Sequence, residues 1–260
     1  MDVWIESLPT AGAGFVIVGG FMLLTVTVGY LVDRFASRDV RIAHNDLAGF
    51  ILAVIGVVYA VLLAFVTIGV WERYQQAEAR SFDEGTKLAV IYRDADRFPQ
   101  SRELREAVRA YTESVINDEW PLMRHGGQSA KADRLLERVD SIVRALPVDG
   151  PGRQDVHAEM LEAVNSTQTD RDTRLSEDST GIDGLLWVVL VSGAVITVGF
   201  TFFFGFRHSL MQQLMTGALG LLIAMVLFLT VALNYPYRGN ISVPPEAFHS
   251  AVRTFDALGP

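Results

Sequence analysis

The stretch Asp46–Trp71, DLAGFILAVIGVVYAVLLAFVTIGVW, decides what kind of protein this chain forms. It carries no charge from Leu47 to Val70. At about 1.5 Å per residue, a helix of that length crosses a hydrocarbon core roughly 30 Å thick. Trp71 and Tyr74 follow at its end, where aromatic rings favour the level of the lipid headgroups. The stretch therefore predicts a transmembrane helix and a membrane protein.

Three further uncharged or nearly uncharged blocks are long enough to span, and short loops join the blocks in pairs. No run of residues alternates with period two, so we expect no sheet. The predicted fold is all-α, with four transmembrane helices in two hairpins and a helical extramembrane domain between the hairpins. The expected parts are a first hairpin over 1–71 (spans about 12–32 and 47–71), a helical domain over 72–181, a second hairpin over 182–234 (spans about 182–206 and 210–233) and a C-terminal tail over 235–260.

The segment between the hairpins holds most of the charge and keeps a helical period of apolar residues. Its first helix is expected to continue the second span. The last helix ends in a polar stretch, STQTDRDTRLSEDST. This is the part of the domain where the sequence supports a helix least, because a helix that is polar all round needs ion pairs or partners. The tail could lie at the membrane interface or pack under the bundle. The predicted helices are 72–98, 101–120 ended by Pro121, 129–146 ended by Pro147, and 153–179.

Composition excludes several functions. The chain has 260 residues and no cysteine, so it has no disulfide and no cysteine metal site. Its first residues lack the basic region of a secretory signal, so the first apolar block is expected to stay as a span. The net charge is −8 without a basic cluster, which argues against a nucleic-acid partner. No motif of a hydrolase, nucleotide-binding enzyme or metalloprotease is present, and the histidines are scattered. We expect no enzyme activity, no metal and no cofactor.

Transport through the spans remains open. Their interiors carry no charge, which argues against a proton-coupled pump, but small, hydroxyl and apolar side chains can line a channel that closes by dewetting. The alternative is that the glycines and alanines are helix contacts and that the threonines bond their own backbone. The candidate pore-lining residues are Gly49, Ala53, Gly56, Tyr59, Ala60 and Thr67 on the second span, followed by Thr216, Thr230 and Asn234 on the fourth.

The positive residues give two answers for the side on which the domain lies. The short loops contain four arginines (Arg34, Arg38, Arg41 and Arg207) and the tails contain two, Arg238 and Arg253. This count favours short loops in the cytoplasm and a domain outside it. If the positive residues at the edges of the domain are counted as well, the side with the domain has more of them, and the count favours a domain in the cytoplasm. Because long domains are translocated largely regardless of charge, the first count is preferred. The expected location is the bacterial inner membrane.

The chain resembles a bacterial family called bestrophin-like, which has two spans, a helical domain and two spans. The resemblance covers essentially the whole chain, and the motif on the second span is fairly specific. It is carried by His44-Asn45-Asp46-Leu47-Ala48-Gly49-Phe50, Gly56-Val57-Val58-Tyr59-Ala60-Val61-Leu62-Leu63-Ala64-Phe65, Trp71-Glu72, Tyr92-Arg93, Glu119-Trp120-Pro121, Leu214-Met215-Thr216 and the exit Asn234–Gly239.

The resemblance implies an oligomeric anion channel with the second span along a central pore and the large domain in the cytoplasm. Bestrophins have aromatic residues in the pore neck and an acidic calcium clasp. Here Phe50, Tyr59 and Phe65 form no compact aromatic cluster, and no acidic clasp is identifiable. The leading hypothesis is a homo-oligomeric channel in the lipid bilayer that conducts inorganic anions, with Tyr59 and Thr67 facing the oligomer axis. The rival is a non-conducting scaffold or sensor whose domain binds a partner.

Overall fold

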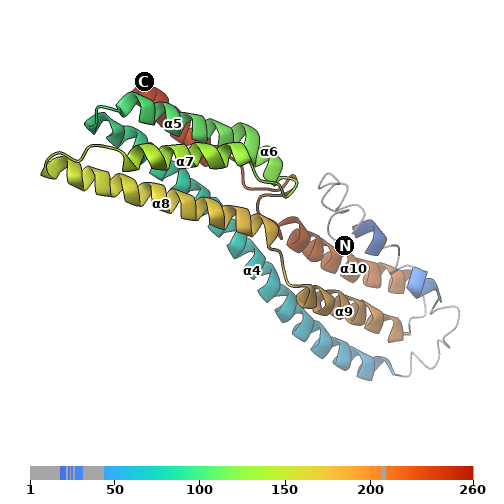
Figure 1. Ribbon diagram of the computed structural model, residues 1–260. Helices are drawn as coiled ribbons and strands as arrows, with labels where there is room; N and C mark the ends of the chain where they lie inside the picture. The colour runs from blue at the N-terminus through green and yellow to red at the C-terminus, as the bar shows by residue number, and fades with distance from the viewer. Residues whose placement is uncertain are drawn as a thin grey trace. The chain divides into compact units, whose positions relative to one another are not determined.

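The structure is a computed structural model that describes residues 18–21, 23, 25, 27–31, 44–205 and 209–259 (Figure 1). These residues contain helices and no strand, which confirms the all-helical fold. The elements are α4 (Asn45–Asp94), η1 (Ala95–Arg97), α5 (Ser101–Ser114), η2 (Val115–Glu119), α6 (Trp120–Met123), α7 (Ala130–Arg144), α8 (Pro151–Ser179), α9 (Gly184–Phe200), η3 (Thr201–Phe203), α10 (Ser209–Ala232) and α11 (Glu246–Leu258).

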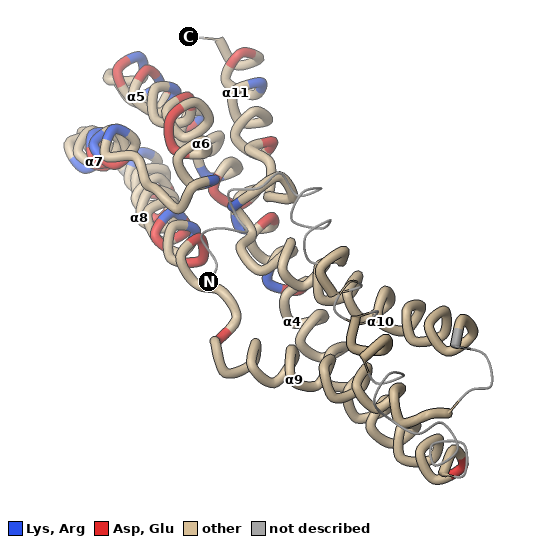
Figure 2. The backbone as a smooth tube through the Cα atoms, turned by 90° about the vertical axis from the view of Figure 1, so that its right-hand side faces the viewer, with Lys and Arg blue, Asp and Glu red and all other residues tan. Residues whose placement is uncertain are grey.

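Three helices in the described part are long and apolar enough to cross a membrane: α4 in its first half, α9 extended by η3, and α10. The first predicted span, about 12–32, lies mostly outside the described residues. Those of 18–31 that are described are helical. As predicted, α4 continues without a break from the second span to Asp94. Figure 2 shows that charged residues gather on α5, α7, α8 and α11 and are absent from α9.

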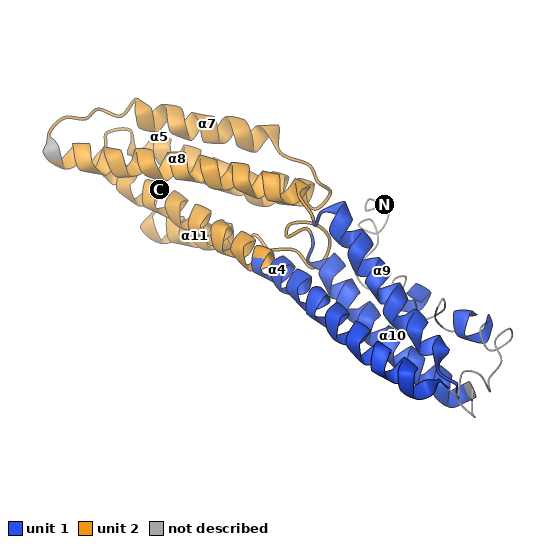
Figure 3. Ribbon diagram, turned by 90° about the horizontal axis from the view of Figure 1, so that it is seen from below, with its two compact units in different colours: residues 1–72, 182–234 blue, residues 73–181, 235–260 orange. Residues whose placement is uncertain are grey.

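The chain divides into two compact units (Figure 3). Unit 1 consists of residues 1–72 and 182–234, and unit 2 consists of 73–181 and 235–260. In unit 1, apolar side chains of α4, α9 and α10 pack into one buried cluster. Inside lipid, each helix satisfies its own backbone, so side-chain packing and a few polar contacts hold such helices together.

Two asparagines fasten the ends of the unit 1 helices. The side chain of Asn45 donates from Nδ2 to the Gly205 carbonyl and accepts from the Gly205 N–H at Oδ1, both at 2.9 Å. This pair of bonds joins the start of α4 to the loop after η3. At the other end, Asn234 Oδ1 accepts from the Ile182 N–H at 2.7 Å, which joins the residues after α10 to those before α9. Each asparagine therefore satisfies backbone groups of a residue near a helix end, where regular secondary structure supplies no partner.

Unit 2 has its own core, built from α5, α7, α8, α11 and the second half of α4. At its centre the Trp120 indole N–H donates to the Val243 carbonyl at 2.9 Å, and the Trp120 ring meets Tyr237 and Phe248 edge-on. Phe255 of α11 is fully buried. The sequence treats 235–260 as a tail at the interface or under the bundle, whereas the structure places 235–259 in unit 2. The reason is the period of Phe248, Ala251 and Phe255, which gives α11 one apolar face.

Pro121 does not end the second domain helix, contrary to the sequence expectation. The chain passes from α5 into one π-helical turn, η2, and on through α6 to Met123. Pro121 lies just after the π turn, so its missing N–H falls where the regular hydrogen bonding of the α-helix is already interrupted. A π turn holds one more residue than an α turn, and it leaves Glu119 and Trp120 both buried.

A network of buried charges links α4, η2 and α8. Arg174 donates from Nε to Glu84 Oε2 and from Nη2 to Glu119 Oε2, both at 3.0 Å. Arg171 donates from Nη2 to Glu119 Oε1 at 2.7 Å, and the Tyr111 hydroxyl donates to Glu84 Oε1 at 2.8 Å. Burial alone would raise the pKa of Glu119, but Arg174 and Arg171 outweigh burial and hold that pKa below its ordinary value.

This network explains why the polar half of α8 is helical. The apolar positions Met160 and Val164 continue along the same face as Thr167, Arg171 and Arg174, all buried. Each arginine pairs with a carboxylate inside the unit, so this face of α8 can be buried without leaving an uncompensated charge. The sequence shows this period of three and four residues, but not which distant carboxylates complete it.

Candidate functional site

The first half of α4 is the least covered of the three spans that the structure describes. In its most apolar 18-residue stretch only 11% of the residues are buried, compared with 33% for α9 and 39% for α10. One face packs on α9 and α10, and the remaining surface is apolar and open. Lipid or other subunits must cover such a surface in a membrane. The exposed large side chains are Leu47, Phe50, Ile51, Val54, Val57, Val58, Val61, Phe65, Ile68 and Trp71.

The small residues of α4 lie along the border between the packed and the open face. Ala53 and Ala60 are exposed, whereas Gly49 and Gly56 are half-buried. A Cβ atom added at Gly56 would meet no atom of the described residues within 4 Å, and one at Gly49 would touch the Phe204 ring at 3.7 Å. Within one chain, therefore, Ala53, Gly56 and Ala60 leave room for a neighbouring helix or for water.

Tyr59 lies on the packed face. Its side chain is buried against α9, and a Cβ atom added at Gly193 would collide with the Tyr59 ring. Glycine at 193 is therefore required for α4 and α9 to approach this closely. The hydroxyl oxygens of Tyr59 and Thr197 are both buried and have no hydrogen-bond partner within the part of the chain that the structure describes.

Two of the predicted threonines, Thr67 on α4 and Thr230 on α10, contact each other. Thr67 Oγ1 donates to the Leu63 carbonyl at 2.8 Å, Thr230 Oγ1 donates to the Val226 carbonyl at 2.9 Å, and the two hydroxyl oxygens lie 3.0 Å apart. Two hydroxyl hydrogens are shared among three contacts. Thr216 is buried within α10. These hydroxyls face the inside of unit 1.

The structure therefore brings together only part of the predicted set. Tyr59, Thr67 and Thr230 belong to the packing of α4 on α9 and α10, and Asn234 holds a helix end. Asn45 was missed as a structural residue, although it stands within the motif that carries the resemblance. Its signal was a polar side chain two residues before a 24-residue apolar run. Among the described residues, no group of histidine, aspartate and glutamate side chains lies where it could hold a metal ion.

The surface of α4 can form an apolar wall but cannot bind an ion through charge. Among its described residues within the span, from Leu47 to Val70, no side chain is titratable except Tyr59, which is buried. A pore lined by such a face excludes ions when narrow and dry and passes them when wide and wet. The chemistry available is therefore size selection and dewetting.

Comparisons with known proteins place the chain in one family. Residues 19–248 match the family model of the Bestrophin-like domain. No curated protein matches the chain. A crystal structure of a variant of a bacterial bestrophin homolog from Klebsiella pneumoniae has a TM-score of 0.69 at 12% identity, covering 94% of this chain and 99% of that chain. A second structure of the Klebsiella homolog gives 0.66 at 10% identity, covering 92% and 97%. A variant described as a membrane protein gives 0.70 at 11%, covering 94% and 99%.

Proposed function

Because the chain belongs to the bestrophin-like family, we propose that it is a homo-oligomeric channel of the bacterial inner membrane that conducts inorganic anions. The pore is formed by α4 from each subunit, with Ala53, Gly56 and Ala60 toward the oligomer axis. The observation that carries the proposal is the open apolar surface of α4, the least buried span in the described chain. A single chain with four spans is too narrow to enclose a water-filled path, so the pore requires several subunits.

The positions of Tyr59 and Thr67 refine the hypothesis based on sequence. Both hold α4 against its own α9 and α10, so the proposal assigns the axis to the small residues beside them. Successive residues of a helix are separated by about 100°. Ala60 and Val58 therefore project on opposite sides of the packed face at nearly the same depth, and both are exposed. They provide a matched pair for testing which side faces the pore.

The test is ion flux from liposomes that contain the purified protein, with chloride and potassium gradients measured separately. We expect chloride flux in the wild type, loss of that flux in Ala60→Trp with assembly retained, and flux retained in Val58→Trp. Assembly is followed by size-exclusion chromatography in detergent. Absence of flux in the wild type under both gradients, or full flux with the indole ring at position 60, would contradict the proposed pore.

The rival function is a membrane-anchored sensor or scaffold. One observation favours it: unit 2 has a core of its own and a buried charge network. In that case no variant dissipates the chloride or the potassium gradient, and a soluble partner copurifies with the full chain in a fixed ratio.

A further inference from the structure

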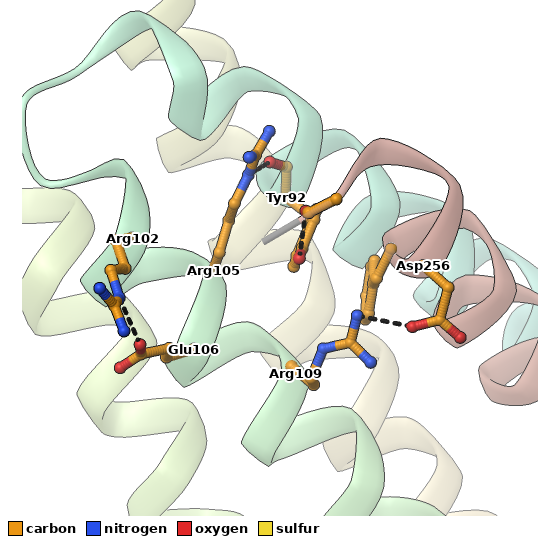
Figure 4. A pocket seen from close by; sticks show the side chains of 8 residues that line it. Tyr92, Arg102, Arg105, Glu106, Arg109 and Asp256 are labelled. Atoms are coloured by element: carbon orange, nitrogen blue, oxygen red, sulfur yellow. Dashed lines mark hydrogen bonds and ion pairs between the residues drawn. The ribbon is translucent and has the colours of Figure 1, made fainter.

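A cavity of about 380 Å³ opens in unit 2 where the last turns of α4, the first half of α5 and the end of α11 meet (Figure 4). Three arginines line it at positions 102, 105 and 109, all on one face of α5. The other lining residues are Tyr92, Glu106, Phe255, Asp256 and Gly259. Its volume lies in the range of sites for small molecules.

Two of the three arginines lie deeper than the carboxylates that pair with them. The Arg105 side chain is 7% exposed and that of Arg109 is 31% exposed. Their carboxylate partners are far more open, with Asp96 65% exposed and Asp256 62% exposed. Ion pairs with such exposed partners are screened by water and contribute about 0–1 kcal/mol each. A ligand anion that enters the cavity can therefore take the place of these carboxylates at little cost.

The two inner guanidinium groups are held in position by an aromatic floor. The rings of Tyr92 and Phe255 stack with centroids 4.3 Å apart. The Arg105 guanidinium carbon lies 4.9 Å from the Tyr92 centroid, and that of Arg109 lies 5.7 Å from the Phe255 centroid. Arg105 Nε also donates to the Tyr92 carbonyl at 3.1 Å. Donors that are fixed before binding lose less conformational entropy when the ligand arrives.

We propose that this cavity binds the phosphate group of a small soluble phosphate monoester. A phosphate dianion offers three acceptor oxygens, and arginine forks match it with paired, charge-assisted hydrogen bonds. Arg105 and Arg109 supply the inner donors, and Arg102, at 87% exposure, closes over the ligand from the rim. The cavity is larger than a bare phosphate, so the rest of the monoester has space beside the group. The site is independent of whether the spans conduct.

The test is calorimetric titration of the full-length protein in detergent with glycerol 3-phosphate and, separately, inorganic phosphate, in about 150 mM NaCl so that the ionic strength stays constant. Glycerol 3-phosphate is expected to bind saturably at one site per chain. Arg109→Gln is expected to weaken it about tenfold, because one set of charge-assisted hydrogen bonds is lost. The control is Arg138→Gln, which removes an exposed arginine of α7 paired with Glu103 outside the cavity and leaves binding unchanged.

Arg102→Gln repeats the test at a side chain so exposed that folding does not depend on it. Saturable binding that both cavity variants weaken and Arg138→Gln does not would support the site. No saturable heat with glycerol 3-phosphate, equal affinity in wild type and both cavity variants, or binding of inorganic phosphate alone would overturn it.

Discussion

Replacing Arg174 with methionine tests whether the buried charge network stabilises unit 2. Arg174 is 1% exposed and bridges Glu84 and Glu119, each at 3.0 Å, under the Trp120 ring. Its removal leaves the Glu84 carboxylate buried with only the Tyr111 hydroxyl as partner. Breaking a buried pair in this way costs about 3–5 kcal/mol. For a protein of this size that corresponds to a fall in melting temperature of roughly 6–20 °C.

The assay is thermal unfolding of the full-length protein in detergent, followed by circular dichroism. Arg102→Met is the matched control, because it removes an arginine whose pair with Glu106 is exposed and worth about 0–1 kcal/mol. In Arg174→Met the buried Glu84 carboxylate loses its counter-charge, and taking up a proton removes the cost of that buried charge, so the loss should shrink when the pH is lowered from about 7 to about 5. A melting temperature equal to that of the control, or a loss independent of pH, would refute the reasoning.

Three further outcomes are expected. Gly193→Ala should disrupt unit 1, because the added methyl group collides with the Tyr59 ring; the purified variant should melt earlier than Gly217→Ala, whose added methyl group meets no atom within 4 Å. The pKa of Glu119 is lower in the folded protein than its ordinary value of 4.5. Its ionised form therefore stabilises the fold above pH 4.5, and this stability is lost as the pH falls through the folded pKa. Glu119→Gln should make the melting temperature depend less on pH in the acid range. Burial, and after it the Glu84 carboxylate, raises the pKa of Tyr111 well above its ordinary value. The stability that goes with this shift is present below pH 10 and is lost as the pH rises towards the higher folded pKa. Tyr111→Phe should reduce that alkaline loss, at a cost of about 1.5–3 kcal/mol at neutral pH, because a hydrogen bond to a buried carboxylate is removed.

The spans could be predicted because lipid leaves the backbone little choice. An uncharged run such as Leu47–Val70 must be helical where no water can satisfy its peptide groups, and its length alone sets where α4 enters and leaves the apolar zone. The continuation of α4 to Asp94 was also predictable, since no proline or glycine pair interrupts the run before Pro99.

Contacts between distant residues could not be predicted. The polar half of α8 looked unstable because the partners of Arg171 and Arg174 lie 52 to 90 residues earlier in the chain. The direction of Tyr59 depends on Gly193 in another helix. A stripe of small residues identifies one side of a helix, but it does not distinguish a neighbour in the same chain from one in another subunit. That is why the predicted site divides into packing residues and open positions.

The place of α11 in the core of unit 2 has a consequence for biosynthesis. Domains generally fold as the ribosome releases them, N-terminal parts first. Here the residues that complete unit 2, including Phe248 and Phe255, are translated after α9 and α10. While the second hairpin is translated and enters the membrane, the apolar surface of unit 2 that α11 will cover therefore stays exposed on α5, α7 and α8. Chaperone contact during translation should concentrate on this interval and end when α11 emerges.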